Sequence, residues 1–198
     1  MEEEVPYKQL LENRREPYKE LFSTARFLCV LLAVLACFLI IFTQILIGVK
    51  VSGDSMQPTL QTGDYLFVCT LTEPEHGDIV VVPNPSDSGA SGKYLIKRVI
   101  GLPGDTIMAE NGVLYRRGPE DTEFHVVEED FLGEPWIGDI PQETVKPGHI
   151  YVLGDNRNNS TDSRRLGQFS IDEMLGVVTQ WSVEHKEFLT AVFGFLQP

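Results

Sequence analysis

The stretch FLCVLLAVLACFLIIFTQILIGV, residues 27–49, decides how the chain is organised. It contains no charged side chain and is apolar on every helical face, unlike a helix that packs on a globular core. A helix needs about 20 such residues to cross a bilayer, whereas a signal-peptide core has roughly 7–15. We therefore predict one transmembrane anchor at residues 27–49. Before it lies a polar, helix-prone segment, residues 1–26, in which Pro6 and Pro17 predict breaks.

Close to the ends of this anchor, basic residues are concentrated on its N-terminal side. Five precede it, whereas Lys50 is the only basic residue between its end and Lys93. Lys and Arg near the ends of a membrane span tend to stay in the cytoplasm, and acidic residues have little influence. We therefore expect a single-pass protein of the cell membrane, with a cytoplasmic N-terminus and an extracytoplasmic portion from residue 50 onward. The five basic residues are Lys8, Arg14, Arg15, Lys19 and Arg26.

The portion after the anchor has the pattern of a mainly β fold. Short β-branched and aromatic runs alternate with turn-forming residues, and Asn111-Gly112 predicts a hairpin. No helical period longer than one turn appears. We predict an antiparallel β-sheet domain over residues 50–182, with a small inserted subdomain or excursion at 106–147 and a C-terminal tail at 183–198. The predicted strands are VSGDSM, DYLFVCTL, DIVVVP, KYLIKRVI, GVLYRR, HIYVLG and MLGVVTQWSV.

Charge and cysteine content exclude two classes of protein. The formal net charge is −13 at pH 7, and neither a basic cluster nor a zinc-ligand spacing is present, so we expect no nucleic-acid partner. Cys29 and Cys37 lie inside the anchor, which leaves Cys69 alone in the rest of the chain. The sequence therefore predicts no internal disulfide framework.

A candidate nucleophile lies in SGDSMQPTL, residues 52–60, shortly after the anchor. Gly53 and Pro58 bend the chain on either side of Ser55, which would present its hydroxyl beside free backbone N–H groups. A serine in such a context more often caps a turn. No histidine stands in a nucleophile motif, and His149, just ahead of a predicted strand, is kept only as a reserve base.

A candidate base lies in YLIKRVIGLPGD, residues 94–105. In a strand, Lys97 shares one face with Leu95 and Val99. If that face is buried, desolvation disfavours the ammonium and lowers the lysine pKa, as a general base near neutral pH requires. An edge-strand lysine that reaches water would have the same pattern, and the pattern alone leaves both interpretations open.

The stretch GDNRNNSTDSRRLG, residues 154–167, is either a polar loop or the support of an active site. As a support it would supply a hydroxyl to orient a neutral lysine and carboxylates to form ion pairs with arginines. The groups in question are Ser160 for the hydroxyl and, for the ion pairs, Asp155 with Arg98 and Asp162 with Arg164.

Four stretches in this order resemble the motifs of bacterial type I signal peptidases: SGDSMQPT, GDYLFV, KRVIGLPGD and GDNRNNSTDSR. The resemblance implies the signal-peptidase β fold and a serine–lysine dyad that uses neither a metal nor another cofactor. Ser55 would be the nucleophile and Lys97 the general base. It also implies that Ser160 orients the lysine, and that the structural polar positions are Asp155, Arg98, Asp162 and Arg164.

One position departs from the commonest family pattern. Many members carry a serine two residues before the nucleophile, whose hydroxyl helps to hold the oxyanion, but here that position is Gly53 and Ser52 lies one residue too early. The chain therefore resembles the glycine-containing branch common in Gram-positive bacteria. The backbone N–H of Ser55 would form part of the oxyanion hole, and a second donor is not identified.

The resemblance implies a serine endopeptidase that removes signal peptides from secretory preproteins through an acyl-enzyme. It implies cleavage after small residues of the A-x-A type. Met56 and Pro58 are candidate substrate-binding residues beside the nucleophile, Met56 facing membrane lipid as well as substrate, and core packing explains Met56 equally well. Two alternatives stay open: a specialised Ser-Lys peptidase that matures a pilin or conjugation protein, and a non-catalytic anchored β module.

Overall fold

The computed structural model describes residues 7–85 and 93–194, with residues 7–21 described by their backbone alone. The chain divides into two compact units, one ending at Gln44 and one beginning at Ile45. The first unit is formed by helix α1, Tyr7–Ile45. The predicted break at Pro17 is wrong, because the helix continues through this position. Pro6 lies outside the described residues.

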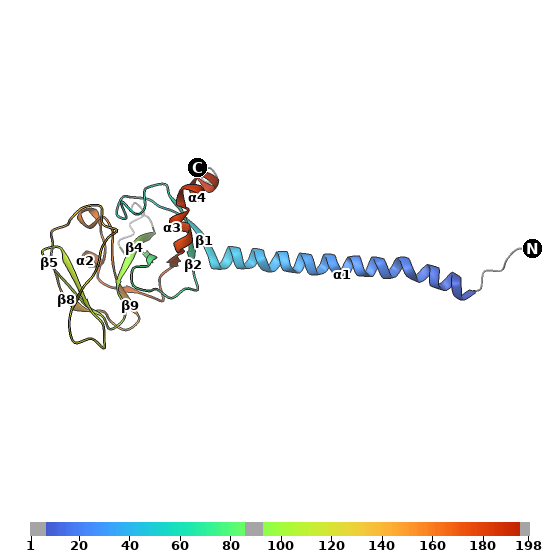
Figure 1. The fold of residues 1–198 in the computed structure, drawn as a ribbon, viewed down its shortest axis with the longest axis horizontal. Coiled ribbons are helices and arrows are strands. Elements are labelled where there is room, and N and C mark those ends of the chain that lie inside the picture. The colour runs from blue at the N-terminus through green and yellow to red at the C-terminus, as the bar shows by residue number, and fades with distance from the viewer. Residues whose placement is uncertain (1–6, 86–92, 195–198) are drawn as a thin grey trace, which may run out of the picture. The chain divides into compact units, whose positions relative to one another are not determined.

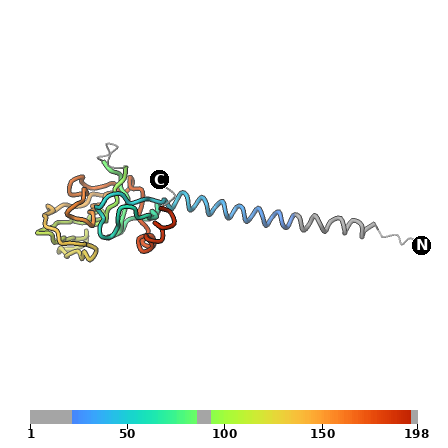
Figure 2. Tube along the Cα trace, turned by 90° about the horizontal axis from the view of Figure 1, so that it is seen from above, coloured from blue at the N-terminus to red at the C-terminus, as the bar shows by residue number. Residues whose placement is uncertain are grey.

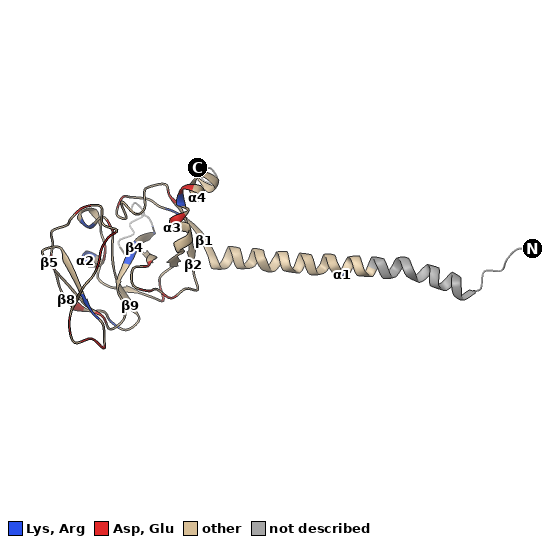
Figure 3. Cartoon of the chain, viewed as in Figure 1, with Lys and Arg blue, Asp and Glu red and all other residues tan. Residues whose placement is uncertain are grey.

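Helix α1 contains a segment that is long and apolar enough to cross a membrane. This segment is Phe22–Ile45, with 24 residues and a mean hydropathy of 2.8. From residue 27 to its end the helix carries no charged side chain (Figure 3). The predicted anchor at 27–49 extends too far, because residues 46–50 form strand β1. The residues of β1 are as apolar as the helix, so hydropathy alone cannot separate a span from the strand that follows it.

Seven antiparallel strands form the larger sheet, in the order β1-β2-β11-β3-β4-β9-β10. Strand β11 comes late in the sequence but lies between β2 and β3. It therefore joins the two earlier strands into one continuous sheet. The predicted mainly β, antiparallel fold is confirmed. The strands are β1 Leu46–Lys50, β2 Tyr65–Cys69, β3 Ile79–Pro83, β4 Tyr94–Gly101, β9 His149–Leu153, β10 Phe169–Ser170 and β11 Gly176–Val178.

A second sheet of four strands lies over residues 106–144, within the range predicted for the inserted subdomain. Asn111 and Gly112, with φ of 51° and 79°, form the tight turn between its two central strands. Buried Ile107 and Leu114 of this sheet pack against Tyr151 of β9 in one shared core. Its strands are β5 Thr106–Glu110, β6 Val113–Arg117, β7 His125–Val126 and β8 Ile140–Thr144, in the order β7-β6-β5-β8.

The prediction that no helix follows residue 50 is wrong. Helix α4, Lys186–Phe193, forms in the segment predicted as a tail and buries Leu189. Its Phe193 stacks on Tyr65 of β2, with ring centroids 5.3 Å apart. Within the compact unit, the second sheet lies at one end and the C-terminal helices at the other (Figures 1 and 2). The other short helices are the 3₁₀ turn Arg157–Asn159, α2 Ser163–Leu166 and α3 Gln180–Glu184.

The predicted strand VSGDSM is also wrong, because residues 51–60 form a series of turns between β1 and β2. Gly53 has a φ of +91°, which is left-handed and ends any extended conformation at this point. Buried Val51, Met56 and Leu60 nevertheless anchor these turns in the core of the larger sheet. We call residues 51–60 the nucleophile turn.

Candidate active site

Ser55 and Lys97 lie side by side although they are 42 positions apart in the chain. The nucleophile turn supplies Ser55, and β4 supplies Lys97, whose backbone pairs with Val80 of β3. The Nζ atom of Lys97 lies 2.7 Å from Oγ of Ser55, within hydrogen-bond distance. The same Nζ donates to the carbonyl of Ile96 at 2.7 Å.

Lys97 is buried, with a residue exposure of 2%. Burial lowers the pKa of its ammonium from 10.5 to about 8, and the nearby carboxylates of Asp162 and Asp155 offset only part of that effect. The lysine therefore faces inward, as one of the two interpretations of its strand pattern required. A large fraction of Lys97 is neutral in mildly alkaline solution, and a neutral amine can accept a proton.

Two pockets, each of about 570 Å³, meet at Ser55 and Lys97, which line both of them. The first is polar, and the other side chains on its wall include Asn84, Asn158, Ser160 and Arg165. The second has a more apolar wall that includes Val49, Val51, Met56, Val81, Leu95 and Leu175. The pair therefore lies at the junction of a polar and an apolar cavity, where a bound chain could extend into both.

The two predicted substrate-binding residues differ in position. Met56 has an exposure of 1%, packs in the core and also lines the apolar pocket. Pro58 lines a separate hollow with Gly133 and Glu134, and neither Ser55 nor Lys97 lines that hollow. The structure therefore brings Met56 to the pair and places Pro58 away from it, because the turn reverses direction between them.

The backbone around Ser55 is arranged to expose its amide. Among the described residues, none accepts a hydrogen bond from the Ser55 N–H. The Ser55 carbonyl, by contrast, accepts from the N–H of Asn156 at 3.0 Å, which holds the turn against the loop after β9. A Cβ added at Gly53 would meet nothing within 4 Å. The Ser55 amide therefore has no acceptor among the described residues and is available to a substrate oxygen.

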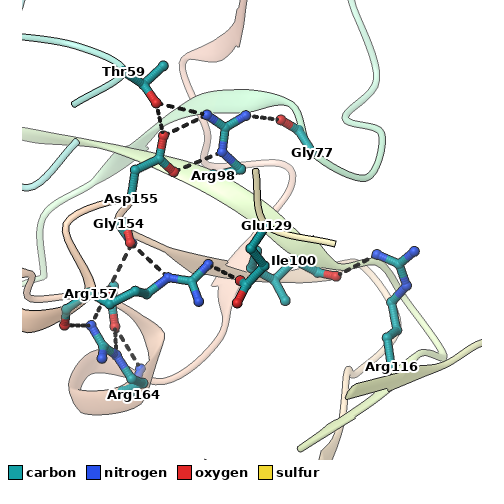
Figure 4. A network of polar contacts seen from close by, with 11 residues as sticks. Thr59, Gly77, Arg98, Ile100, Arg116, Glu129, Gly154, Asp155, Arg157 and Arg164 are labelled. Carbon is teal, nitrogen blue, oxygen red and sulfur yellow. Dashed lines mark hydrogen bonds and ion pairs between the residues drawn. The ribbon is translucent and has the colours of Figure 1, made fainter. Parts of the chain in front are cut away.

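Arg98, the residue after Lys97 in β4, forms a bidentate ion pair with Asp155 (Figure 4). Arg98 Nε and Nη2 donate to the two carboxylate oxygens of Asp155 at 2.8 and 2.6 Å. Nη1 of the same guanidinium donates to the carbonyl of Gly77 at 2.7 Å. Thr59 Oγ1 donates to Asp155 at 2.5 Å, which ties the nucleophile turn to this pair. Both the strand of Lys97 and the turn of Ser55 are thus held by one carboxylate.

Asp162 and Arg164 form the second ion pair, which shapes the loop after β9. Arg164 Nε and Nη2 both lie 2.8 Å from the Asp162 carboxylate, which also accepts from the Gly154 N–H at 3.0 Å. Burial would raise the pKa of Asp162, but the hydrogen bonds from Arg164 and Gly154 outweigh it and the pKa is lowered. Asp162 is therefore ionised near neutral pH.

Ser160 does not form the predicted hydrogen bond with Lys97. Its Oγ is buried and meets hydrogen-bond geometry with none of the described residues, although it lies close enough to the Asp162 carboxylate to help lower the pKa of that group. The hydroxyl lies so close to Gly154 that a Cβ at that glycine would be 2.2 Å from Oγ. Ser160 does share the polar pocket with Lys97. The structure thus brings the two residues to one cavity without joining them.

The reserve base His149 lies elsewhere, with Nδ1 2.9 Å from the carbonyl of Pro147. No histidine is among the described residues that line the two pockets. Among the side chains that the structure describes, in residues 22–85 and 93–194, no group of three or more His, Cys, Asp or Glu could hold a metal ion. Sequence reasoning missed Thr59 and Glu129. Thr59 lies four residues after Ser55 in the same stretch, SGDSMQPTL, so that motif could have pointed to it. Nothing in the sequence distinguishes Glu129 from the acidic residues around it.

The chain matches a family model described as signal peptidase, peptidase S26, over residues 23–182. It is 37% identical over 134 residues to probable signal peptidase I-1 of Synechocystis sp., a match that covers 64% of this chain and 65% of that protein. The matched part thus spans just under two thirds of that relative.

Two relatives from Bacillus subtilis (strain 168) give similar results. Signal peptidase I T is 37% identical over 136 residues, with 64% of this chain and 68% of that protein covered. Signal peptidase I U is 34% identical over 165 residues, with 74% of this chain and 82% of that protein covered. The matched range of the family model includes Ser55, Lys97 and both ion pairs.

Proposed function

The chain belongs to the signal peptidase family, peptidase S26, and we propose that it is a membrane-anchored serine endopeptidase that removes signal peptides from secretory preproteins. Ser55 is the nucleophile and Lys97 the general base of this proposal. The observation that carries it is the 2.7 Å contact between Lys97 Nζ and Ser55 Oγ, made by a lysine with an exposure of 2%.

The proposed acylation begins with neutral Lys97. Its lone pair takes the proton of the Ser55 hydroxyl as Oγ attacks the carbonyl carbon of the scissile bond. The carbonyl oxygen becomes an oxyanion, which the open N–H of Ser55 stabilises. The resulting Lys97 ammonium then gives its proton to the leaving amine, and an ester between Ser55 and the signal peptide remains.

Deacylation uses the same groups in the reverse roles. Lys97, neutral again, takes a proton from a water molecule that attacks the ester carbonyl. The proton then passes to Ser55 Oγ as the ester bond breaks and the signal peptide leaves. We propose that Ser160 assists here, because its buried hydroxyl lacks a partner and lines the cavity that contains Lys97.

The apolar pocket supports a substrate bound as an added strand. Its wall contains Val49–Gly53 from one segment and Tyr94–Lys97 from another. Strand β1 is at the edge of the sheet, and the first half of β4 pairs only with β3, so both segments have free backbone groups for an extended peptide. The apolar wall next to Ser55 suits the small, uncharged side chains of an A-x-A site.

The anchor follows from helix α1. Its Phe22–Ile45 segment is long enough to span a bilayer. Basic residues precede it in excess, which favours a cytoplasmic N-terminus and an extracytoplasmic active site. Because β1 begins at Leu46, directly after the helix, the proposed site acts close to the membrane surface, where the end of a signal peptide emerges.

The test is cleavage of a purified reporter preprotein in detergent by the full chain. We expect wild type to release a product whose N-terminus follows a small residue, and Ser55→Ala and Lys97→Met to release none. Lys93→Met is the matched control, because Lys93 is exposed and directly precedes the same strand. Cleavage by Lys97→Met at the wild-type rate would exclude the dyad, and no cleavage by wild type would favour a non-catalytic module.

A further inference from the structure

A short part of the excursion between β7 and β8 packs on the back of the active-site loop. We call residues 129–136 the clamp segment and residues 154–164 the catalytic loop. The clamp segment contacts the catalytic loop through an ion pair, cation–π contacts and hydrogen bonds. In the hydrogen bonds, Asn158 Nδ2 donates to Glu134 Oε1 at 2.8 Å and to the carbonyl of Pro135 at 3.3 Å.

Glu129 provides the charge. Its Oε1 lies 2.5 Å from Nη2 of Arg157, and the two side chains are 10% and 1% exposed (Figure 4). Burial lowers the pKa of the Arg157 guanidinium and the carboxylate of Glu129 opposes that effect. A buried guanidinium is costly unless a carboxylate compensates it. Glu129 therefore compensates the charge of Arg157 and favours a buried position for its guanidinium.

Two aromatic rings complete the contact. The Arg98 guanidinium lies 4.1 Å from the ring centroid of Phe131, and that of Arg157 lies 5.9 Å from the same centroid. Trp136 is buried and lies 5.5 Å from Arg157 and 5.6 Å from Arg164. Cation–π contacts of this kind fix the plane of a guanidinium. The clamp segment thus contacts all three arginines that order the catalytic loop and β4.

Arg157 transmits this contact toward Ser55. Its Nε donates to the carbonyl of Gly154 at 3.0 Å, and its own carbonyl accepts from Arg164 at 2.9 Å. The neighbouring Asn156 N–H donates to the carbonyl of Ser55. Arg98 is the residue next to Lys97 in β4. A displacement of Arg157 or Arg98 would therefore move the backbone on both sides of the dyad.

We propose that Glu129 and Phe131 of the clamp segment are positioning residues, which hold Ser55 and Lys97 at reacting distance through Arg157 and Arg98. The inference rests on the function proposed above. The clamp segment lines neither of the two pockets that contain Ser55, so it acts through the arginines and not on the substrate.

The expected effect of a loosened clamp is a slower chemical step. Glu129→Gln leaves the Arg157 charge without a buried partner, so the catalytic loop shifts and water reaches Lys97. Misplacement of reacting groups by about 1 Å costs on the order of 10²-fold in rate. We expect kcat for preprotein cleavage to fall between about 10- and 100-fold with a much smaller change in KM, because the groove for an added strand is formed by β1 and β4 and, of the two pockets, the catalytic loop lines only the polar one.

A second readout does not depend on cleavage. In full-length protein labelled with ¹³C at lysine Cε, NMR titration reports the midpoint of Lys97 directly. The charged groups that face Lys97 are Asp155 and Asp162, and both carboxylates remain in the variants. A rise of the midpoint in Glu129→Gln or Phe131→Ala therefore reports hydration of Lys97.

Each variant has a matched control. Glu128→Gln makes the same change at the preceding, exposed residue. Phe124→Ala removes a ring of the same excursion that lies 4.9 Å from Arg117, away from the dyad. Glu129→Asp keeps the charge and should recover most of the lost kcat. If thermal unfolding shows that Glu129→Gln is not folded, Phe131→Ala and the milder Phe131→Leu carry the comparison, and Glu129→Asp remains the variant expected to behave like wild type.

The proposal is supported if the Glu129 and Phe131 variants lower kcat and raise the Lys97 midpoint while both controls match wild type. Equal kcat and equal midpoints in variants and controls would overturn it. If wild type cleaves no preprotein, the proposed function fails, and the NMR midpoint alone then decides the positioning role.

Discussion

The backbone N–H of Asn156 donates to the carbonyl of Ser55 at 3.0 Å. This bond joins the nucleophile turn to the loop after β9, and Thr59 and Arg98 join both to β4 through Asp155. Three segments that are distant in sequence therefore hold Ser55 and Lys97 as one unit. The predictions below each remove one part of this unit.

Lys97→Met should stabilise the protein at neutral pH. The pKa of Lys97 is about 8 in the folded chain and 10.5 when unperturbed, so the unfolded state binds more protons between these values. Wild-type stability therefore rises with pH across this window, and below it the buried amine costs about 3 kcal/mol. Urea unfolding of both proteins should give the largest difference below pH 8 and none above pH 10.5. An equal difference at both extremes would contradict the linkage.

Asp155→Asn should destabilise the fold strongly. The carboxylate is fully buried and compensates the Arg98 guanidinium, so its loss leaves a charge without a partner. Breaking such a buried pair costs about 3–5 kcal/mol. Asp172→Asn, at an exposed position, is the control and should change the free energy of unfolding by less than about 0.5 kcal/mol. Similar urea midpoints for the two variants would show that the pair is not needed.

Gly154→Ala should disturb the site by steric overlap. The new Cβ would lie 2.2 Å from Ser160 Oγ and 2.5 Å from the Ser55 carbonyl. Overpacking of this kind costs about 1–3 kcal/mol. The double variant Gly154→Ala, Ser160→Ala should recover only part of the lost stability, because the overlap with Ser55 remains. If the double variant had the thermal stability of wild type, the destabilisation by Gly154→Ala would come entirely from overlap with Ser160, which would contradict this prediction.

Ser160→Ala should lower kcat by about fivefold, since the hydrogen bond to Lys97 that we propose for Ser160 during turnover is worth about 1 kcal/mol. The effect should be far smaller than that of Lys97→Met. Ser170→Ala in β10 is the control. Steady-state cleavage of the reporter preprotein measures both variants, and an unchanged kcat in Ser160→Ala would remove Ser160 from the mechanism.

The sequence predicted most of the larger sheet, and it left the direction of Lys97 open between an inward and a solvent-facing side chain. The strands of that sheet are β-branched runs between turn residues, and Lys97 is flanked by apolar neighbours on its own face of β4. Such local patterns are visible without the fold. The turn around Ser55 did not by itself distinguish a nucleophile from a serine that caps a turn. The resemblance to signal peptidases is what identified Ser55 as the candidate nucleophile.

The parts that sequence reasoning missed depend on distant contacts. The end of helix α1 is decided by the pairing of β1 with β2 and not by a change in hydropathy. Glu129 stands among several exposed acidic residues, and only its contact with Arg157 distinguishes it. Helix α4 packs on β2, with Leu189 buried and Phe193 in contact with Tyr65 and Phe67. The sequence of this short helix alone does not reveal that contact.

The most direct test of the dyad is the pH dependence of Ser55 acylation. A penem that acylates the serine is added to full-length protein in detergent, and intact mass reports the rate. We expect the rate to rise with pH through a midpoint of about 8, as Lys97 loses its proton, and to be lost in Lys97→Met. A rate that stays constant from about pH 6 to about pH 10, or that persists in Lys97→Met, would contradict Lys97 as the base.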